Sequence, residues 1–176
     1  NPNPANGDLI GWDFIHNDGL PYDDQGHGTH TAGSIGAVGG NGIGISGVSQ
    51  KVSIMALKFL SAQGQGSTAD AIKAIDYAVA HGARVLSNSW GGKSDPNSPS
   101  DQQENKALYD SIDRARQAGV LFVAAAGNEG KNNDKASEAS YPAAFDNDNV
   151  LSVAATDESD KLAFFSNTGA VTTDLA

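Results

Sequence analysis

Apolar residues along the chain follow two patterns, and each pattern predicts a different kind of element. The run at 120–126, Val-Leu-Phe-Val-Ala-Ala-Ala, is apolar without alternation, as expected for a strand covered on both faces of a parallel sheet. Four further short runs predict strands at 8–14, 51–60, 84–87 and 150–155.

Apolar residues at helical spacing occur between these strands. Ile72, Ile75 and Val79 recur at this spacing, and Ser67 with Asp70 has the spacing of a capping box in front of them. Helices are also predicted over 27–37 and 101–118. Because strands alternate with helices, the pattern predicts one α/β domain over residues 1–176, with a doubly wound, mostly parallel sheet and helices on both faces.

The composition excludes several classes of function. The formal net charge is −10, and since phosphate binding needs clustered Lys and Arg, we expect no nucleic-acid partner. Because the chain has no cysteine, it has no disulfide, thiolate metal site or cysteine nucleophile. No apolar stretch approaches the roughly 20 residues that cross a bilayer, so we expect no membrane partner.

Three segments carry the candidate chemistry. In residues 24–33, Asp-Gln-Gly-His-Gly-Thr-His-Thr-Ala-Gly, His27 stands between two glycines at a predicted helix start, where an exposed imidazole can act as a general base. Residues 87–92, Ser-Asn-Ser-Trp-Gly-Gly, end a predicted strand, where α/β folds build ligand crevices. Residues 124–130, Ala-Ala-Ala-Gly-Asn-Glu-Gly, place the amide of Asn128 after a buried strand.

Taken in this order, the three segments resemble the subtilisin-like serine proteases, the subtilase family. The His-Gly-Thr-His segment is highly specific, and the resemblance runs from about Gly11 to the end of the chain. It implies a secreted endopeptidase that hydrolyses peptide bonds through a Ser-His-Asp triad. By the same resemblance, His27 is the general base, His30 is a structural histidine and Asn128 is the oxyanion donor.

The resemblance also implies a site for a peptide or protein substrate, bound in extended conformation at a sheet edge. Residues 64–66 would belong to a second clamping strand, and residues 89–91 and 125–127 would form the walls of the pocket for the residue before the scissile bond. Small residues in these walls leave room for a large apolar side chain. The expected substrate-binding residues are Gly64, Gly66, Ser89, Trp90, Gly91, Ala125, Ala126 and Gly127.

Calcium is the structural cofactor that the resemblance implies. Residues 39–45 resemble the family's tight calcium loop, and hard oxygen ligands suit this cation. The expected ligands are the Asn41 side chain and the carbonyls of Gly39, Ile43 and Ile45. A second site found in some members would use Asp13 and Asp18, although His16 stands where those members carry an acidic residue.

Two parts of the family's pattern are not found in this sequence. None of Asp8, Asp13 and Asp18 is followed by Ser/Thr-Gly, which carries the family's catalytic aspartate, and no Gly-Thr-Ser-Met-Ala segment supplies a nucleophile. We therefore expect a central fragment of a protease, cut at both ends, that is inactive by itself. Apolar sheet surface exposed by the cut would favour self-association. The alternative is a non-catalytic pseudoenzyme that binds peptides or self-assembles.

Two other motif interpretations fit less well. Residues 42–47, Gly-Ile-Gly-Ile-Ser-Gly, match the dinucleotide fingerprint, but they follow a predicted helix, whereas the fingerprint follows a strand and opens a helix. His27 and His30 are three residues apart with no intervening Glu, whereas the histidines of zinc proteases are four apart with a Glu between them.

Overall fold

The computed structural model describes residues 10–176. These residues form two compact units, of which the first ends at Ala74 and the second spans Ile75–Ala176. Helix α2 (Thr68–Ala80) crosses the boundary between them. Its start is capped as predicted, since the Ser67 hydroxyl oxygen accepts a hydrogen bond from the Asp70 amide at 3.0 Å. The prediction of one domain stays a prediction.

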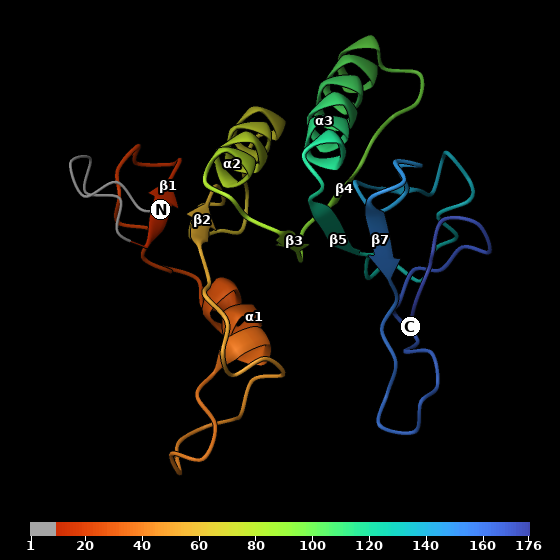
Figure 1. Ribbon diagram of the computed structural model, residues 1–176. Helices are drawn as coiled ribbons and strands as arrows, with labels where there is room; N and C mark the ends of the chain where they lie inside the picture. Colours follow the sequence, from red (N-terminus) through yellow and green to blue (C-terminus); the bar gives the residue numbers. More distant parts are fainter. Residues whose placement is uncertain (1–9) are drawn as a thin grey trace. The chain divides into compact units, whose positions relative to one another are not determined.

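The first unit contains two short parallel strands and a helix (Figure 1). Strand β1 (Gly11–Asp13) pairs with β2 (Ala56–Lys58), and Gly11 lies opposite Ala56. A Cβ atom on Gly11 would lie 1.7 Å from the Ala56 carbonyl oxygen, so only glycine fits at this close approach. Helix α1 (His27–Gly36) lies between the two strands in sequence.

The second unit is built on a parallel sheet in the order β3-β5-β7 (Figure 1). These strands are Val85–Asn88, Leu121–Ala125 and Val150–Val153. Helix α3 (Pro99–Gln117) packs against β5. Ile112 of the helix and Phe122 of the strand are fully buried, so they are part of the core. A small antiparallel pair is formed by β4 (Gly92–Lys93), which follows β3 in sequence, and β6 (Ser140–Tyr141), which follows β5.

The predicted α/β class and the mostly parallel strand pairing are confirmed. The strands are shorter than their apolar runs, and residues 8 and 9 of the first predicted strand lie outside the described residues. Within the second unit, Phe122 and Ala124 are buried and Leu121 is 40% exposed, so coverage of both faces of 120–126 stays a prediction. Among residues 10–176, no helix has the length and apolarity needed to cross a membrane.

Candidate active site

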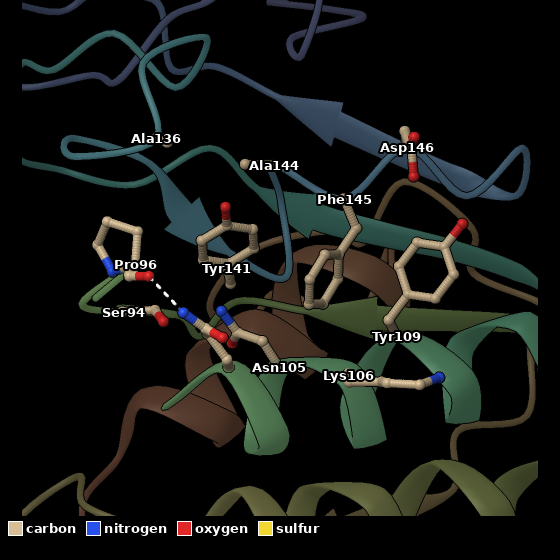
Figure 2. Close-up of a pocket in the computed structure, with 11 residues that line it drawn as sticks. Ser94, Pro96, Asn105, Lys106, Tyr109, Ala136, Tyr141, Ala144, Phe145 and Asp146 are labelled. Atoms are coloured by element: carbon tan, nitrogen blue, oxygen red, sulfur yellow. Dashed lines mark hydrogen bonds between the residues drawn. The ribbon is translucent and has the colours of Figure 1, made fainter. Parts of the chain in front are cut away.

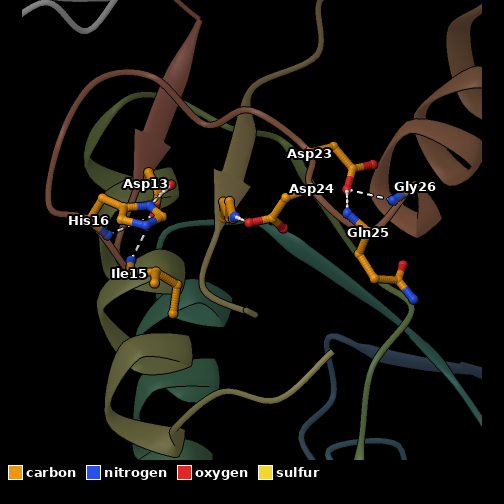
Figure 3. Close-up of polar contacts among 8 residues, drawn as sticks. Asp13, Ile15, His16, Asp23, Asp24, Gln25 and Gly26 are labelled. Carbon is orange, nitrogen blue, oxygen red and sulfur yellow. Dashed lines mark hydrogen bonds and ion pairs between the residues drawn. The ribbon is translucent and has the colours of Figure 1, made fainter. Parts of the chain in front are cut away.

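His27 is the first residue of α1, and a carboxylate four residues earlier organises this end of the helix. Gly26, at the N-cap, has a φ of 98° and offers no side chain. Asp23 instead accepts hydrogen bonds from the amides of Gln25 and Gly26, at 3.0 and 2.8 Å (Figure 3). It also accepts from the Thr29 amide and hydroxyl, both at 2.7 Å. One side chain thus accepts from three backbone amides and one hydroxyl at the helix start, among them the Thr29 amide in the first turn, which has no carbonyl partner within the helix.

The charge of Asp23 follows from these contacts. The Thr29 hydroxyl, followed by the amides of Gly26, Gln25 and Thr29, holds the pKa of this carboxyl well below its usual range. An anion at the positive end of a helix is also favoured by the helix dipole. Asp23 was not predicted from the sequence, although it stands three residues before Gly26, the first residue of the segment Gly-His-Gly-Thr-His-Thr.

The two histidines of this helix are exposed. The His27 amide donates to the Gln25 side-chain oxygen at 2.9 Å, which holds the backbone next to the imidazole. The His30 amide donates to the Gly26 carbonyl at 3.0 Å, as expected in the first turn of the helix. An exposed imidazole at a capped helix start can exchange protons with a bound molecule, whereas the structural role expected for His30 stays a prediction.

Asp13, an expected calcium ligand, ends β1 and is 2% exposed (Figure 3). One carboxylate oxygen accepts from the amides of Ile15 and His16, at 2.7 and 3.0 Å, and the other contacts His16 Nδ1 at 2.8 Å. Burial raises the pKa of Asp13, but these hydrogen bonds, with the His16 side chain first among them, outweigh it and lower the pKa. Both carboxylate oxygens therefore have hydrogen-bond partners within the chain, and coordination of a cation by Asp13 stays a prediction. Asp18, the second expected ligand, accepts from the Leu20 amide at 2.9 Å.

The loop at 39–45 contains the other expected calcium site. Gly40, Gly42 and Gly44 all have φ near 60–70°, which curls the backbone as only glycine does readily. Asn41 is exposed, and its side-chain oxygen accepts a hydrogen bond from the Ile43 amide at 3.0 Å. Among the described residues, no group of three or more His, Cys, Asp and Glu side chains could hold a metal ion. A cation in this loop would therefore be bound by the amide oxygen of Asn41 and by carbonyls.

In the second unit, the two expected pocket walls leave neighbouring parallel strands at the same edge. Asn88, the last residue of β3, is in register with Ala124 of β5. Residues 89–91 and 125–127 therefore begin side by side. Asn88 is buried. Its side-chain nitrogen donates to the Val123 carbonyl at 3.3 Å, and its side-chain oxygen accepts from Trp90 Nε1 at 3.0 Å. These bonds fix the start of the first wall against the second strand.

Asn128 follows at the carboxyl end of β5 and is exposed. The preceding Gly127 has a φ of 113°, and a Cβ atom there would lie 2.3 Å from the side-chain nitrogen of Asn167. Glycine is therefore required at the turn that presents the Asn128 amide. Asn128 belongs to the second unit and His27 to the first, and their convergence on one crevice stays a prediction.

Gly64 and Gly66 do not lie in a strand within the described residues. Instead the Gly64 amide donates to the Ser61 carbonyl and the Ser61 amide to the Gln65 carbonyl, both at 2.8 Å, which closes a turn after β2. Gly64 has a φ of 73°, as this turn requires. A Cβ atom on Gly66 would lie 2.3 Å from the Phe59 carbonyl oxygen. The turn accounts for both glycines, and their contact with substrate stays a prediction.

A cavity of about 590 Å³ lies in the second unit beside α3 (Figure 2). Its wall contains the rings of Tyr109, Tyr141 and Phe145. Phe145 meets Tyr109 edge-on at 5.5 Å between ring centroids and is tilted against Tyr141 at 4.8 Å. None of the residues predicted for catalysis or substrate binding lines this cavity.

Comparison with known proteins supports the motifs. The sequence model of the subtilase family matches residues 6–176. The chain is 38% identical to thermitase from Thermoactinomyces vulgaris over 161 residues, which cover 92% of this chain and 52% of thermitase. It is 40% identical over 147 residues to the minor extracellular protease Epr from Bacillus subtilis, covering 84% of this chain and 20% of Epr. It is 37% identical over 171 residues to the major intracellular serine protease of Bacillus subtilis, covering 94% and 50%.

Solved structures that resemble this chain are also proteases. A cold-adapted subtilisin-like serine proteinase superposes with a TM-score of 0.76 at 32% identity, covering 94% of this chain and 53% of the other. A lanthipeptide protease superposes with a TM-score of 0.79 at 27% identity, covering 92% and 46%. The chain thus spans about half the length, or less, of these proteins. Its sequence and its parallel α/β architecture place it in one family: the chain belongs to the subtilases.

Proposed function

We propose that the protein containing this chain is a serine endopeptidase, in which His27 is the general base of a Ser-His-Asp triad and Asn128 is the oxyanion donor. One observation carries the assignment. Both residues are exposed at the ends of regular elements, and each directly follows a glycine with φ near 100°. Glycines in this conformation present the next side chain without steric cover, as a general base and an oxyanion donor require.

The proposed reaction is acyl transfer to a serine. As the serine oxygen attacks the peptide carbonyl, His27 takes its proton, and later gives it to the leaving amine. The Asn128 amide donates a hydrogen bond to the oxygen that becomes negative in the tetrahedral intermediate. The serine and the aspartate that orients His27 would come from outside residues 1–176, and we propose that these residues alone are inactive.

The substrate is proposed to be a peptide or protein bound in extended conformation. Residues 89–91 and 125–127, which leave adjacent strands at the same edge, would form the walls of the pocket for the residue before the scissile bond. Gly64 and Gly66 would contact the peptide on its other side. The walls contain Ser, Gly and Ala besides Trp90, so the pocket would accept a large apolar side chain.

Calcium is proposed as a structural cofactor of the loop at 39–45, because the exposed Asn41 oxygen and backbone carbonyls are hard donors. The cation would stabilise the loop that follows α1, with no part in the chemical step. Secretion is proposed as well. The similar proteins include one described as extracellular and one as intracellular, and detection of the protein in the medium or inside the cells decides between these locations.

A second candidate function is a non-catalytic, self-assembling chain. Val85 and Leu121 lie opposite each other in β3 and β5 and are 56% and 40% exposed. Such an apolar sheet surface can be covered by another copy. Light scattering and a peptidase assay on the whole protein distinguish the two candidates, since an assembly of the whole protein that lacks peptidase activity supports only the second.

The test of the proposed function is peptide hydrolysis by the whole protein and two variants. His27→Ala should lower kcat by about 10⁶, the loss that follows removal of the histidine in subtilisin, a member of the same family. The matched control is His81→Ala, whose side chain stacks on Tyr77 at the end of α2 and which should leave kcat within about threefold. Hydrolysis that survives in His27→Ala would refute the assignment of the general base.

A further inference from the structure

A buried amide from a distant part of the chain holds the turn that carries Asn128. Asn167 is 0% exposed. Its side-chain oxygen accepts hydrogen bonds from the Glu129 amide at 3.0 Å and from the Lys131 amide at 2.9 Å. The turn after β5 is therefore pinned on the C-terminal side of Asn128 by a residue about 40 positions further along the chain.

The nitrogen of the same side chain completes the connection. It donates to the Glu129 carboxylate at 2.8 Å and to the side-chain oxygen of Asn133 at 3.3 Å. The same Glu129 oxygen accepts from the backbone N–H of Asn128 at 3.1 Å. Asn133 is 2% exposed, and its nitrogen donates to the Ala126 carbonyl at 2.8 Å. All the hydrogen-bonding capacity of the Asn167 amide is used.

The backbone of Asn167 holds the other side of the turn. Its amide donates to the Gly127 carbonyl at 2.9 Å, so Asn167 binds residues before and after Asn128. The side-chain nitrogen occupies the space where a Cβ atom of residue 127 would lie. Gly127 and Asn167 therefore pack directly against each other. A buried hydrogen-bond network in which every donor and acceptor has a partner is rigid.

We propose that Asn167 is a positioning residue, which sets the direction of the Asn128 amide by fixing the backbone on both sides of it. This inference rests on the proposed function. Asn128 is exposed, so its direction depends on the backbone that carries it. Stabilisation of an oxyanion requires donors that are already oriented before the charge develops. Because the oxyanion forms only in the transition state, loss of Asn167 should lower kcat and leave KM nearly unchanged.

The first experiment measures kcat and KM of the whole protein with a peptide substrate. Asn167→Ala should lower kcat by about 10-fold or more, with KM changed by less than about twofold, because small displacements of a catalytic group reduce the rate strongly. The matched control is Asn149→Ala. Asn149 is also a buried asparagine that binds backbone carbonyls, those of Val120 and Ile112 at 2.9 and 3.4 Å. This control should leave kcat within about twofold, and an equal loss in both variants would overturn the proposal.

A double-mutant cycle separates positioning from a general structural role. If Asn167 acts only through Asn128, then Asn167→Ala should change kcat by less than about threefold in the Asn128→Ala background. The same loss in both backgrounds would contradict the proposal. The failures are distinguishable: a normal kcat in Asn128→Ala alone refutes the proposed oxyanion donor, whereas a normal kcat in Asn167→Ala alone refutes only the positioning role.

Amide hydrogen exchange in the unmodified protein tests the inference even if Asn167→Ala does not fold. The Glu129 and Lys131 amides donate to a buried oxygen, so they should exchange as slowly as amides within β5. Asn167→Ser, which keeps an oxygen acceptor in a smaller side chain, should lose less of kcat than Asn167→Ala. Exchange of both amides at the rate of an open loop would show that Asn167 does not fix the turn.

Discussion

Removal of the Asp23 carboxylate should destabilise the start of α1, where the proposed general base lies. Asp23→Ala deletes the acceptor of three backbone amides and one hydroxyl, at 2.7–3.0 Å. Loss of a helix N-cap costs about 0.5–2 kcal/mol, and a charge at a helix end contributes about 0.3–1 kcal/mol. Because water can reach these exposed donors, we expect a loss of about 1–2 kcal/mol in the free energy of unfolding. Asp23→Asn, which keeps one acceptor, should lose about half as much.

The loss should depend on pH in a defined direction. The pKa of Asp23 in the folded protein is lowered, so its ionised form stabilises the fold at every pH above the pKa of the unfolded chain, about 3.9. This stabilisation disappears as pH falls through the lower, folded-state pKa. The difference in stability between the unmodified protein and Asp23→Ala should thus be constant from pH 7 to about pH 5 and shrink below about pH 4.

The assay is urea unfolding of the whole protein, blocked with a serine-directed inhibitor so that it does not digest itself. Glu158→Ala is the matched control, because it also removes one exposed negative charge and should change stability by less than about 0.5 kcal/mol. Equal stability of Asp23→Ala and the control at pH 7 would refute the capping role. A difference that grows as pH falls below 4 would refute the sign of the pKa shift.

Three further predictions concern the helices, the cation and specificity. Ser98 caps α3, accepting from the Asp101 amide at 3.3 Å, so Ser98→Ala should lower the free energy of unfolding by about 1 kcal/mol in the same urea assay. Millimolar calcium should raise the melting temperature, since a ligand of the folded state stabilises it, and Asn41→Ala should abolish the rise; identical calorimetric curves with calcium and with chelator would exclude the site. Peptides with Phe or Leu before the scissile bond should be cleaved with a higher kcat/KM than those with Lys or Arg, and the reverse order would contradict the proposed pocket.

Local sequence patterns predicted the regular elements well. The helix expected over 101–118 occurs at Pro99–Gln117, and the apolar run at 120–126 contains β5 at Leu121–Ala125. The helix was predicted from its repeating apolar face and the strand from an uninterrupted apolar run, and both patterns are visible within a short stretch of sequence. The pair β4–β6 was missed, since two-residue strands are too short for any period to be detected.

The contacts that support the site were harder to predict. The motifs identified His27 and Asn128, but not Asp23 or Asn167. Asn167 holds the turn after β5 from 36–38 residues away, and its neighbours in sequence show no periodic pattern. Such contacts depend on how loops meet in space, which a sequence pattern read locally does not encode. His16 was predicted only in part. The sequence showed that His16 stands where some family members carry an acidic residue, but not that its ring contacts the Asp13 carboxylate.

The most direct test of the proposed activity is labelling of the whole protein with a fluorophosphonate, followed by mass spectrometry of the modified peptide. A serine activated by His27 should be labelled stoichiometrically at a position outside residues 1–176, and His27→Ala should abolish the label, because the reagent reacts with an activated serine. Residues 1–176 alone should remain unlabelled. Labelling at a serine within these residues, such as Ser89, or undiminished labelling in His27→Ala, would contradict the proposed mechanism.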